Sequence, residues 1–168
     1  TITASDATII YGESLDTITL AYTQAGILEG DVVAVELSVE GYTTSATPGS
    51  TFVVKASSSD NRYAFTFVDG TLTVLKKDIT VKANDASVVY GSDADLSALT
   101  STITGLVGED TIDVTYTTDY VAGQDAGKMF DITPHVGHDY YNVTIAKGTL
   151  TVLKKDATIK IDSASVTY

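Results

Sequence analysis

The chain has 168 residues, no cysteine, and 22 acidic against 10 basic side chains, which gives a formal net charge of −12. The absence of cysteine excludes disulfide bonds and thiolate chemistry, and the acidic balance disfavours nucleic acid and anionic membrane surfaces as partners. No apolar run approaches the length of about 18 residues that a membrane-spanning helix needs, so we expect no membrane insertion.

Short runs of alternating apolar and polar residues predict an all-β chain with little or no helix. Ile18, Leu20 and Tyr22 form one such run, and Leu72 and Val74 belong to another. Runs of this kind, bounded by Gly, Asp, Ser and Asn, are typical of half-buried antiparallel strands. In chain order, the first strands are expected at residues 2–10, 17–24, 32–40, 50–57, 62–68 and 71–76.

Glycine marks the predicted turns between these strands. Tyr11-Gly12 ends the first strand, where glycine lets the backbone turn at a point at which a Cβ atom would clash. Residues 68–71 predict a tight hairpin in which Asp69-Gly70 supplies the positive φ angles. A single helical turn is possible at residues 27–31 and again at residues 106–110.

The pattern then repeats, because residues 70–78 (GTLTVLKKD) recur letter for letter as residues 148–156. Tyr11-Gly12 matches Tyr90-Gly91 at a spacing of 79 residues. The sequence therefore predicts two tandem domains, repeat 1 at residues 1–77 and repeat 2 at residues 78–155. Residues 156–168 correspond to the first strand of a truncated third repeat, so we expect the chain to be a fragment of a longer array.

The connection between the repeats contains no Gly, Pro or Ser, and only Lys76, Lys77 and Asp78 separate two apolar strand patterns. A flexible linker has a different composition. We therefore expect two small domains arranged end to end, in a monomer whose partners are neighbouring repeats of the same chain.

The motifs of both repeats resemble the MBG ("mostly β-grasp") repeat, which occurs in tandem in large bacterial surface proteins. The resemblance rests on Ala83-Asn84-Asp85-Ala86-Ser87, Tyr90-Gly91, Gly105 with Asp110, Gly123 with Gly127, Tyr141, and residues 148–152. Repeat 1 departs from it at Ser5-Asp6-Ala7-Thr8 and at Pro48-Gly49. The resemblance implies a β-grasp-like fold and implies no catalytic residues.

Three groups of residues are candidates for binding chemistry. Acidic residues near the turns could hold calcium, which needs six to eight oxygen ligands; the candidates are Asp93, Asp95, Glu109 and Asp110, with Glu13, Asp16, Glu29 and Asp31 in repeat 1. No complete calcium-loop spacing occurs, so solvated turns that cap backbone donors are the competing interpretation. His135, His138 and Asp139 could approach a metal, although repeat 1 has serines and Asp60 at the matching positions, which favours solvated loop histidines.

Ten tyrosines form the last group, and Tyr42 and Tyr120 occupy matching positions. Exposed tyrosine rings can stack on sugars, whereas packed tyrosines support a sheet and reach water with the hydroxyl. The sequence favours packing. The sequence contains no nucleophile–base motif, so we predict no catalytic residue. We also predict no cofactor-binding residue; the one alternative is a bound calcium ion at the acidic residues named above.

These observations favour a non-enzymatic stalk or spacer in an adhesin that is extracellular, either secreted or on the bacterial cell surface. Its task would be to project a binding region from the cell. The alternative is a weak multivalent binding module for host glycan or protein, in which repetition raises avidity.

Overall fold

The computed structural model describes residues 1–161, and within them the chain is all-β, as predicted. The helical segments of this part are two 3-10 turns, η1 (Leu15–Thr17) and η2 (Leu96–Ala98). Among the described residues, no helix has the length and apolar character that crossing a membrane requires.

The described residues form two compact units. The first unit comprises Thr1–Ile79 together with Thr104–Ile112 and Gly137–Thr144, and the second comprises Thr80–Ile103, Asp113–Val136 and the described residues from Ile145 onward. Repeat 2 therefore contributes residues to both units.

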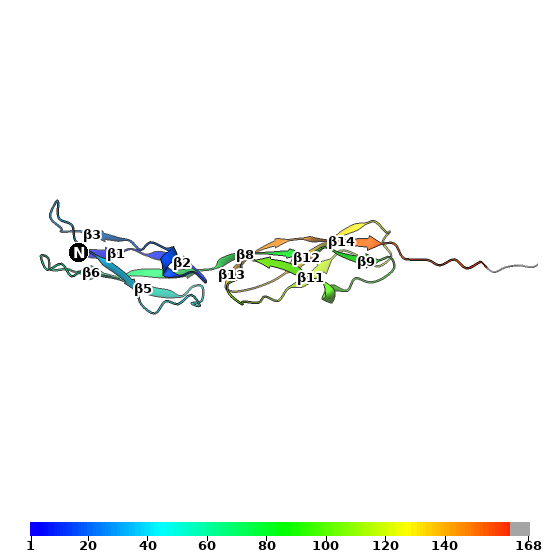
Figure 1. Ribbon diagram of the computed structural model, residues 1–168, viewed down its shortest axis with the longest axis horizontal. Coiled ribbons are helices and arrows are strands. Elements are labelled where there is room, and N and C mark those ends of the chain that lie inside the picture. The colour runs from blue at the N-terminus through cyan, green and yellow to red at the C-terminus, as the bar shows by residue number, and fades with distance from the viewer. Residues whose placement is uncertain (162–168) are drawn as a thin grey trace, which may run out of the picture. The chain divides into compact units, whose positions relative to one another are not determined.

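The first unit contains two sheets (Figure 1). In the three-stranded sheet, β1 (Ile2–Ala4) lies between β3 (Tyr22–Gln24), which is antiparallel to it, and β6 (Phe67–Val68), which is parallel. In the four-stranded sheet the order is β2 (Ala7–Ile10), β7 (Gly70–Leu75), β5 (Thr51–Ser57) and β4 (Glu36–Val39). Within it, β2 and β7 are parallel and the other pairs are antiparallel.

The second unit repeats the four-stranded sheet. Its order is β11 (Thr115–Thr118), β12 (Met129–His135), β14 (Gly148–Leu153) and β9 (Ala86–Val89), with β14 and β9 parallel. Repeat 2 also contains a three-stranded sheet, with the order β10 (Ser101–Thr104), β8 (Lys77–Ala83) and β13 (Tyr141–Ala146).

The parallel pairs correct the expectation of purely antiparallel strands. Residues Ala7 to Ile10 pair in register with Leu72 to Leu75, and Ala86 to Val89 pair with Leu150 to Leu153. Each repeat thus places its second strand, β2 or β9, beside its last, running in the same direction. Alternation of apolar residues reports which face is buried and not which way a neighbour runs, so the sequence pattern alone could not show this.

The hairpin expected at residues 68–71 is also wrong. Gly70 does not have a positive φ, and β6 and β7 on either side of Asp69 belong to different sheets. The predicted strand 2–10 is divided in the same way, because β1 and β2 separate at Ser5-Asp6 and enter different sheets. Residues 2–10 and residues 67–75 therefore each pass from one sheet to the other, and they do so next to each other.

Several predicted strands are shorter than expected. The segments 17–24, 32–40 and 62–68 contribute only β3, β4 and β6, whereas 50–57 and 71–76 correspond closely to β5 and β7. The alternating residues outside these strands are not part of any strand. The helical turns expected at 27–31 and 106–110 are single hydrogen-bonded turns, closed by Asp31 N to Leu28 O and Asp110 N to Val107 O, each at 3.0 Å.

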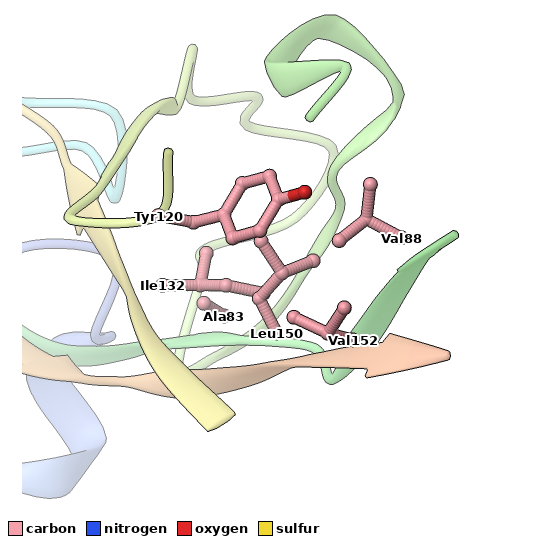
Figure 2. Packing of buried hydrophobic residues seen from close by; sticks show 6 residues of the cluster. All are labelled: Ala83, Val88, Tyr120, Ile132, Leu150 and Val152. Carbon is pink, nitrogen blue, oxygen red and sulfur yellow. The ribbon is translucent and has the colours of Figure 1, made fainter. Parts of the chain in front are cut away.

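Apolar side chains from the inner faces of these strands form the core of the second unit (Figure 2). Figure 2 shows Leu150 and Val152 of β14 beside Ile132 of β12, with the Tyr120 ring above them. Ala83 and Val88 complete the cluster. In repeat 1 the equivalent strands bury Ile9, Val54, Leu72 and Val74.

Residues 154–161 contain no strand, so the expected first strand of a third repeat does not form in this described part. Ile159 and Ile161, whose alternation suggested it, are 87% and 88% exposed. The rest of that expectation, up to Tyr168, lies outside the described residues.

Candidate functional site

The Tyr-Gly turns, residues 11–13 and 90–92, have the same backbone geometry in both repeats. Tyr11 N donates to Leu75 O and Tyr90 N to Leu153 O, each at 2.9 Å, so each turn is fixed to the end of the last strand of its repeat. Gly12 and Gly91 have φ angles of 87° and 83°. Only glycine adopts such angles without strain, which is why it follows tyrosine at both positions.

Tyr42 and Tyr120, the candidates for ligand stacking, brace these turns. Each ring meets a phenylalanine edge-on with 5.4 Å between ring centroids, Tyr42 on Phe52 and Tyr120 on Phe130. Each hydroxyl donates to the carbonyl of the third turn residue, Glu13 or Ser92. Burial raises the pKa of the Tyr42 hydroxyl. Both tyrosines are thus packed against their own repeat.

The Gly–Asp loops, residues 26–31 and 105–110, form the second recurring feature. In each loop a tyrosine from a later segment donates its hydroxyl proton to the aspartate and accepts a hydrogen bond from a backbone N–H. In repeat 1, Tyr63 bonds to Asp31 and to Leu28 N. In repeat 2, Tyr141 bonds to Asp110 and to Val107 N. The same tyrosine thus closes the loop in both repeats, and in repeat 1 Arg62 also pairs with Asp31 at 3.2 Å.

The turn of repeat 1 and the loop of repeat 2 meet within the first compact unit. The Tyr11 hydroxyl donates to Oδ2 of Asp110 at 3.0 Å, and the same oxygen accepts from Tyr141. Burial is the largest cause that raises the pKa of Tyr11, and burial with the Asp110 hydrogen bond raises that of Tyr141 to about 12. Both phenols therefore stay protonated and act as donors at neutral pH.

Aromatic and aliphatic contacts surround these hydrogen bonds. The Tyr11 ring lies 5.2 Å from that of Tyr140 and 5.7 Å from that of Tyr141, between centroids. A Cβ atom added to Gly12 would lie 2.5 Å from a methyl carbon of Val107, so the glycine leaves the space that this valine occupies. His138 packs on the same two tyrosines of repeat 2, at 5.3 and 5.1 Å.

The four acidic residues considered as calcium ligands, Asp93, Asp95, Glu109 and Asp110, lie in or near these turns and loops. Asp110 accepts two phenol hydrogen bonds. Asp95 accepts from the Ser97 hydroxyl at 2.6 Å and caps η2 through Ser97 N at 3.0 Å, and these two bonds, the hydroxyl's above all, lower the pKa of Asp95. Asp93 and Glu109 are exposed. Within residues 1–161, no three His, Asp or Glu side chains come close enough together to hold a metal ion.

The two histidines have different surroundings. His135 ends β12, where its Nε2 lies 2.8 Å from Thr117 Oγ1. Nδ1 of His138 accepts from Tyr140 N at 3.2 Å. Asp139, the third member of the sequence motif, is exposed.

Sequence reasoning missed the meeting of Tyr11 with Asp110. Both residues were identified as parts of the repeated pattern, and the constant spacing of Tyr11 to Tyr90 and Asp31 to Asp110 was the available signal. Spacing shows that a residue recurs, but not that Tyr11 of repeat 1 contacts Asp110 of repeat 2.

The model of the MBG domain family, YGX type, matches residues 1–73 and again residues 79–151. The chain belongs to the MBG family. No curated protein matches the chain. The two matches confirm the predicted tandem MBG repeat, and the chain carries the Tyr-Gly-X signature as Tyr11-Gly12-Glu13 and Tyr90-Gly91-Ser92. In this MBG pair the signature forms the turn that Tyr42 or Tyr120 braces.

The chemistry of this site is that of a packing surface. The phenols and the carboxylate are bonded to one another, and every fully buried side-chain nitrogen or oxygen of the described residues has a hydrogen-bond partner. Such a group holds segments of chain together.

Proposed function

We propose that these MBG repeats are non-enzymatic stalk repeats of a bacterial cell-surface adhesin, which hold a binding region away from the cell. Family membership supports a repeated, extracellular role. The end-to-end arrangement of the repeats belongs to this proposal.

The observation that carries the proposal is the parallel pairing of the terminal strands. In repeat 1 the chain enters through β1 and β2 and leaves through β7, which lies parallel to β2. In repeat 2 the corresponding pair is β9 and β14. A pull on the two ends of a repeat loads such a pair along the strand axis, so its ladder of hydrogen bonds must break together. Antiparallel terminal strands would instead be peeled apart one bond at a time.

The side chains around the Tyr-Gly turns support a structural role. Tyr42, Tyr120 and Asp110, the residues with the most distinctive environments, donate or accept hydrogen bonds within the fold. The net charge of −12 keeps neighbouring molecules apart and in solution, as a projecting surface segment requires.

Single-molecule pulling from the two ends of the chain tests the proposal. We expect two unfolding events with a gain in length of roughly 250 Å each, since about 78 residues at ~3.3–3.6 Å each replace a folded domain about 30 Å across. The chain has no cysteine, so handles can be placed freely. In a matched control, Ser14→Cys and Lys76→Cys attach the handles just beyond the same ends of β2 and β7.

The control geometry peels β2 from β7, whereas the end-to-end geometry shears them. The stalk proposal expects a much larger unfolding force in the end-to-end geometry. Equal forces in the two geometries would remove its mechanical basis. A glycan array on the same chain addresses the alternative, because reproducible binding there would favour a binding module.

A further inference from the structure

The two Tyr-Gly turns have the same fold but different surroundings. Tyr11 is 6% exposed and Tyr90 is 44% exposed. A Cβ atom on Gly12 would collide with Val107, whereas one on Gly91 would meet nothing within 4 Å. The turn of repeat 1 is covered by the Gly–Asp loop of repeat 2, whereas within residues 1–161 the turn of repeat 2 is uncovered.

The uncovered turn has the same backbone hydrogen bonds as the covered one. Tyr90 N bonds to Leu153 O and Ser92 N to Val89 O, at 2.9 and 3.0 Å, just as Tyr11 and Glu13 do in the covered turn. Tyr120 holds Ser92 O from the other side. No rearrangement of the backbone is needed for Tyr90 to make the contacts that Tyr11 makes.

The Gly–Asp loop, which covers a turn in repeat 2, also has its closed form in repeat 1, where it covers no turn of the described residues. The Gly–Asp loop of repeat 1 is closed by Tyr63, which bonds to Asp31 and Leu28 N as Tyr141 bonds to Asp110 and Val107 N. Leu28, the counterpart of Val107, is 72% exposed. The loop therefore presents an apolar side chain before any turn engages it, and its aspartate, Asp31, is also paired with Arg62 at 3.2 Å.

We propose that Tyr90-Gly91 is a docking site for the Gly–Asp loop of a further MBG repeat joined to this chain after Lys155. The apolar residue of that loop covers Gly91, its aspartate accepts the Tyr90 hydroxyl, and its loop-closing tyrosine meets the Tyr90 ring edge-on. The inference rests on the geometry of the turns and is independent of the proposed stalk function.

The connecting residues favour a repeat in the same chain as the occupant. Lys154-Lys155-Asp156 follows β14 with the same letters as Lys76-Lys77-Asp78 after β7. In the first unit that connection bonds to the segment that bears the loop-closing Tyr141: Lys77 N donates to Tyr140 O at 3.2 Å and Asp78 accepts from the Asn142 amide at 2.9 Å. Separate copies, each with a charge of −12, repel one another.

The experiment uses the chain with a copy of residues 78–155 inserted after Lys155. In the inserted copy, the tyrosine equivalent to Tyr90 is replaced by phenylalanine, so that the peptide containing Tyr90 is unique by mass. Nitration by tetranitromethane is then followed for each tyrosine by mass spectrometry. In the 168-residue chain we expect Tyr90 to react quickly and Tyr11 slowly; in the extended chain Tyr90 should slow to the rate of Tyr11.

A matched variant separates docking from general shielding. Changes equivalent to Val107→Ser and Asp110→Ala, made only in the inserted copy, should restore fast nitration of Tyr90 and leave Tyr11 slow. A second extension, residues 1–77 placed after Ala157, presents the loop with Leu28 and Asp31 and should protect Tyr90 as well. If one of the two added repeats does not fold, the other extension still tests the inference.

Two results would overturn the inference. One is unchanged nitration of Tyr90 in an extended chain whose circular dichroism shows the added repeat to be folded. The other is protection of Tyr90 that depends on protein concentration, since this would make a second molecule the occupant.

Discussion

At the scale of single residues, glycine has two distinct physical roles in this chain. Gly12 and Gly91 supply positive φ angles at turns. Gly70 and Gly148 lie within strands and allow close approach of two backbones: a Cβ on Gly70 would lie 2.5 Å from Ser5 O, and one on Gly148 would lie 2.6 Å from Ala83 O. Both of the latter sit where a strand crosses from one sheet to the other.

The first prediction concerns this close approach. Gly70→Ala should destabilise repeat 1 by about 2–4 kcal/mol, because a backbone oxygen cannot move aside as a flexible side chain can. Urea unfolding measures the loss. Gly137→Ala is the control, since that glycine lacks a positive φ and has open space around its Cβ position; a loss of similar size in both variants would contradict the explanation.

The second prediction concerns the aspartate at the same crossing. Asp6 Oδ1 accepts from Thr71 N, and Asp85 Oδ1 accepts from Thr149 N, each at 2.8 Å. Asp6→Ala removes the acceptor and should cost about 1 kcal/mol of unfolding free energy. Asp6→Asn retains an acceptor oxygen and should recover most of the loss; if Asn and Ala are equally destabilising, charge and not the hydrogen bond is responsible.

At the scale of elements, the chain is built from a turn and a loop that recur with the same internal bonds. The Tyr-Gly turn is fixed by the last strand and by Tyr42 or Tyr120, and the Gly–Asp loop is closed by Tyr63 or Tyr141. Because the turn has the same internal bonds in both repeats, the same substitution made in each copy differs only in the effect of the residues around it.

The third prediction uses this duplication. Gly91→Ala places alanine at a positive φ and should cost about 1–2 kcal/mol. Gly12→Ala has the same strain and also collides with Val107, so it should cost a further ~1–3 kcal/mol. Urea unfolding followed through resolved NMR signals of each repeat gives the two values.

A double variant checks the cause of that difference. Val107→Ala removes the colliding methyl groups, so its effect and that of Gly12→Ala should be less than additive when combined. Equal losses for Gly12→Ala and Gly91→Ala would show that Val107 contributes nothing to the cost.

The sequence was informative about elements that depend on local signals. Alternation located β5 and β7, and Tyr11-Gly12 located a turn with positive φ. It failed at Gly70, because glycine beside aspartate predicts a hairpin equally well when the true requirement is the approach of Ser5 from the far end of the repeat. The candidate site was missed for the same reason: Tyr11 and Asp110 are 99 residues apart, and only folding shows that they share a hydrogen bond.

At the scale of the whole molecule, protonation links four hydrogen-bonded tyrosines to stability. The pKa values of Tyr11, Tyr42 and Tyr63 are raised, and that of Tyr141 is raised to about 12. An unfolded chain releases its tyrosine protons near pH 10. Between that pH and the higher folded values the unfolded state binds fewer protons, so the free energy of unfolding falls as pH rises.

The fourth prediction is therefore alkaline lability. The stabilisation from these phenols is fully present below about pH 10 and should be lost as pH rises toward 12, which a series of thermal melts from pH 8 to 12 would show as a falling Tm. Tyr141→Phe should lower Tm at pH 8, because Val107 N loses its acceptor, yet flatten the decline above pH 10. Tyr90→Phe, at the exposed turn, should leave Tm at pH 8 unchanged. A decline as steep in Tyr141→Phe as in the original chain would assign the effect to groups other than Tyr141, such as the Tyr11 phenol or the ion pair of Lys147 with Asp131.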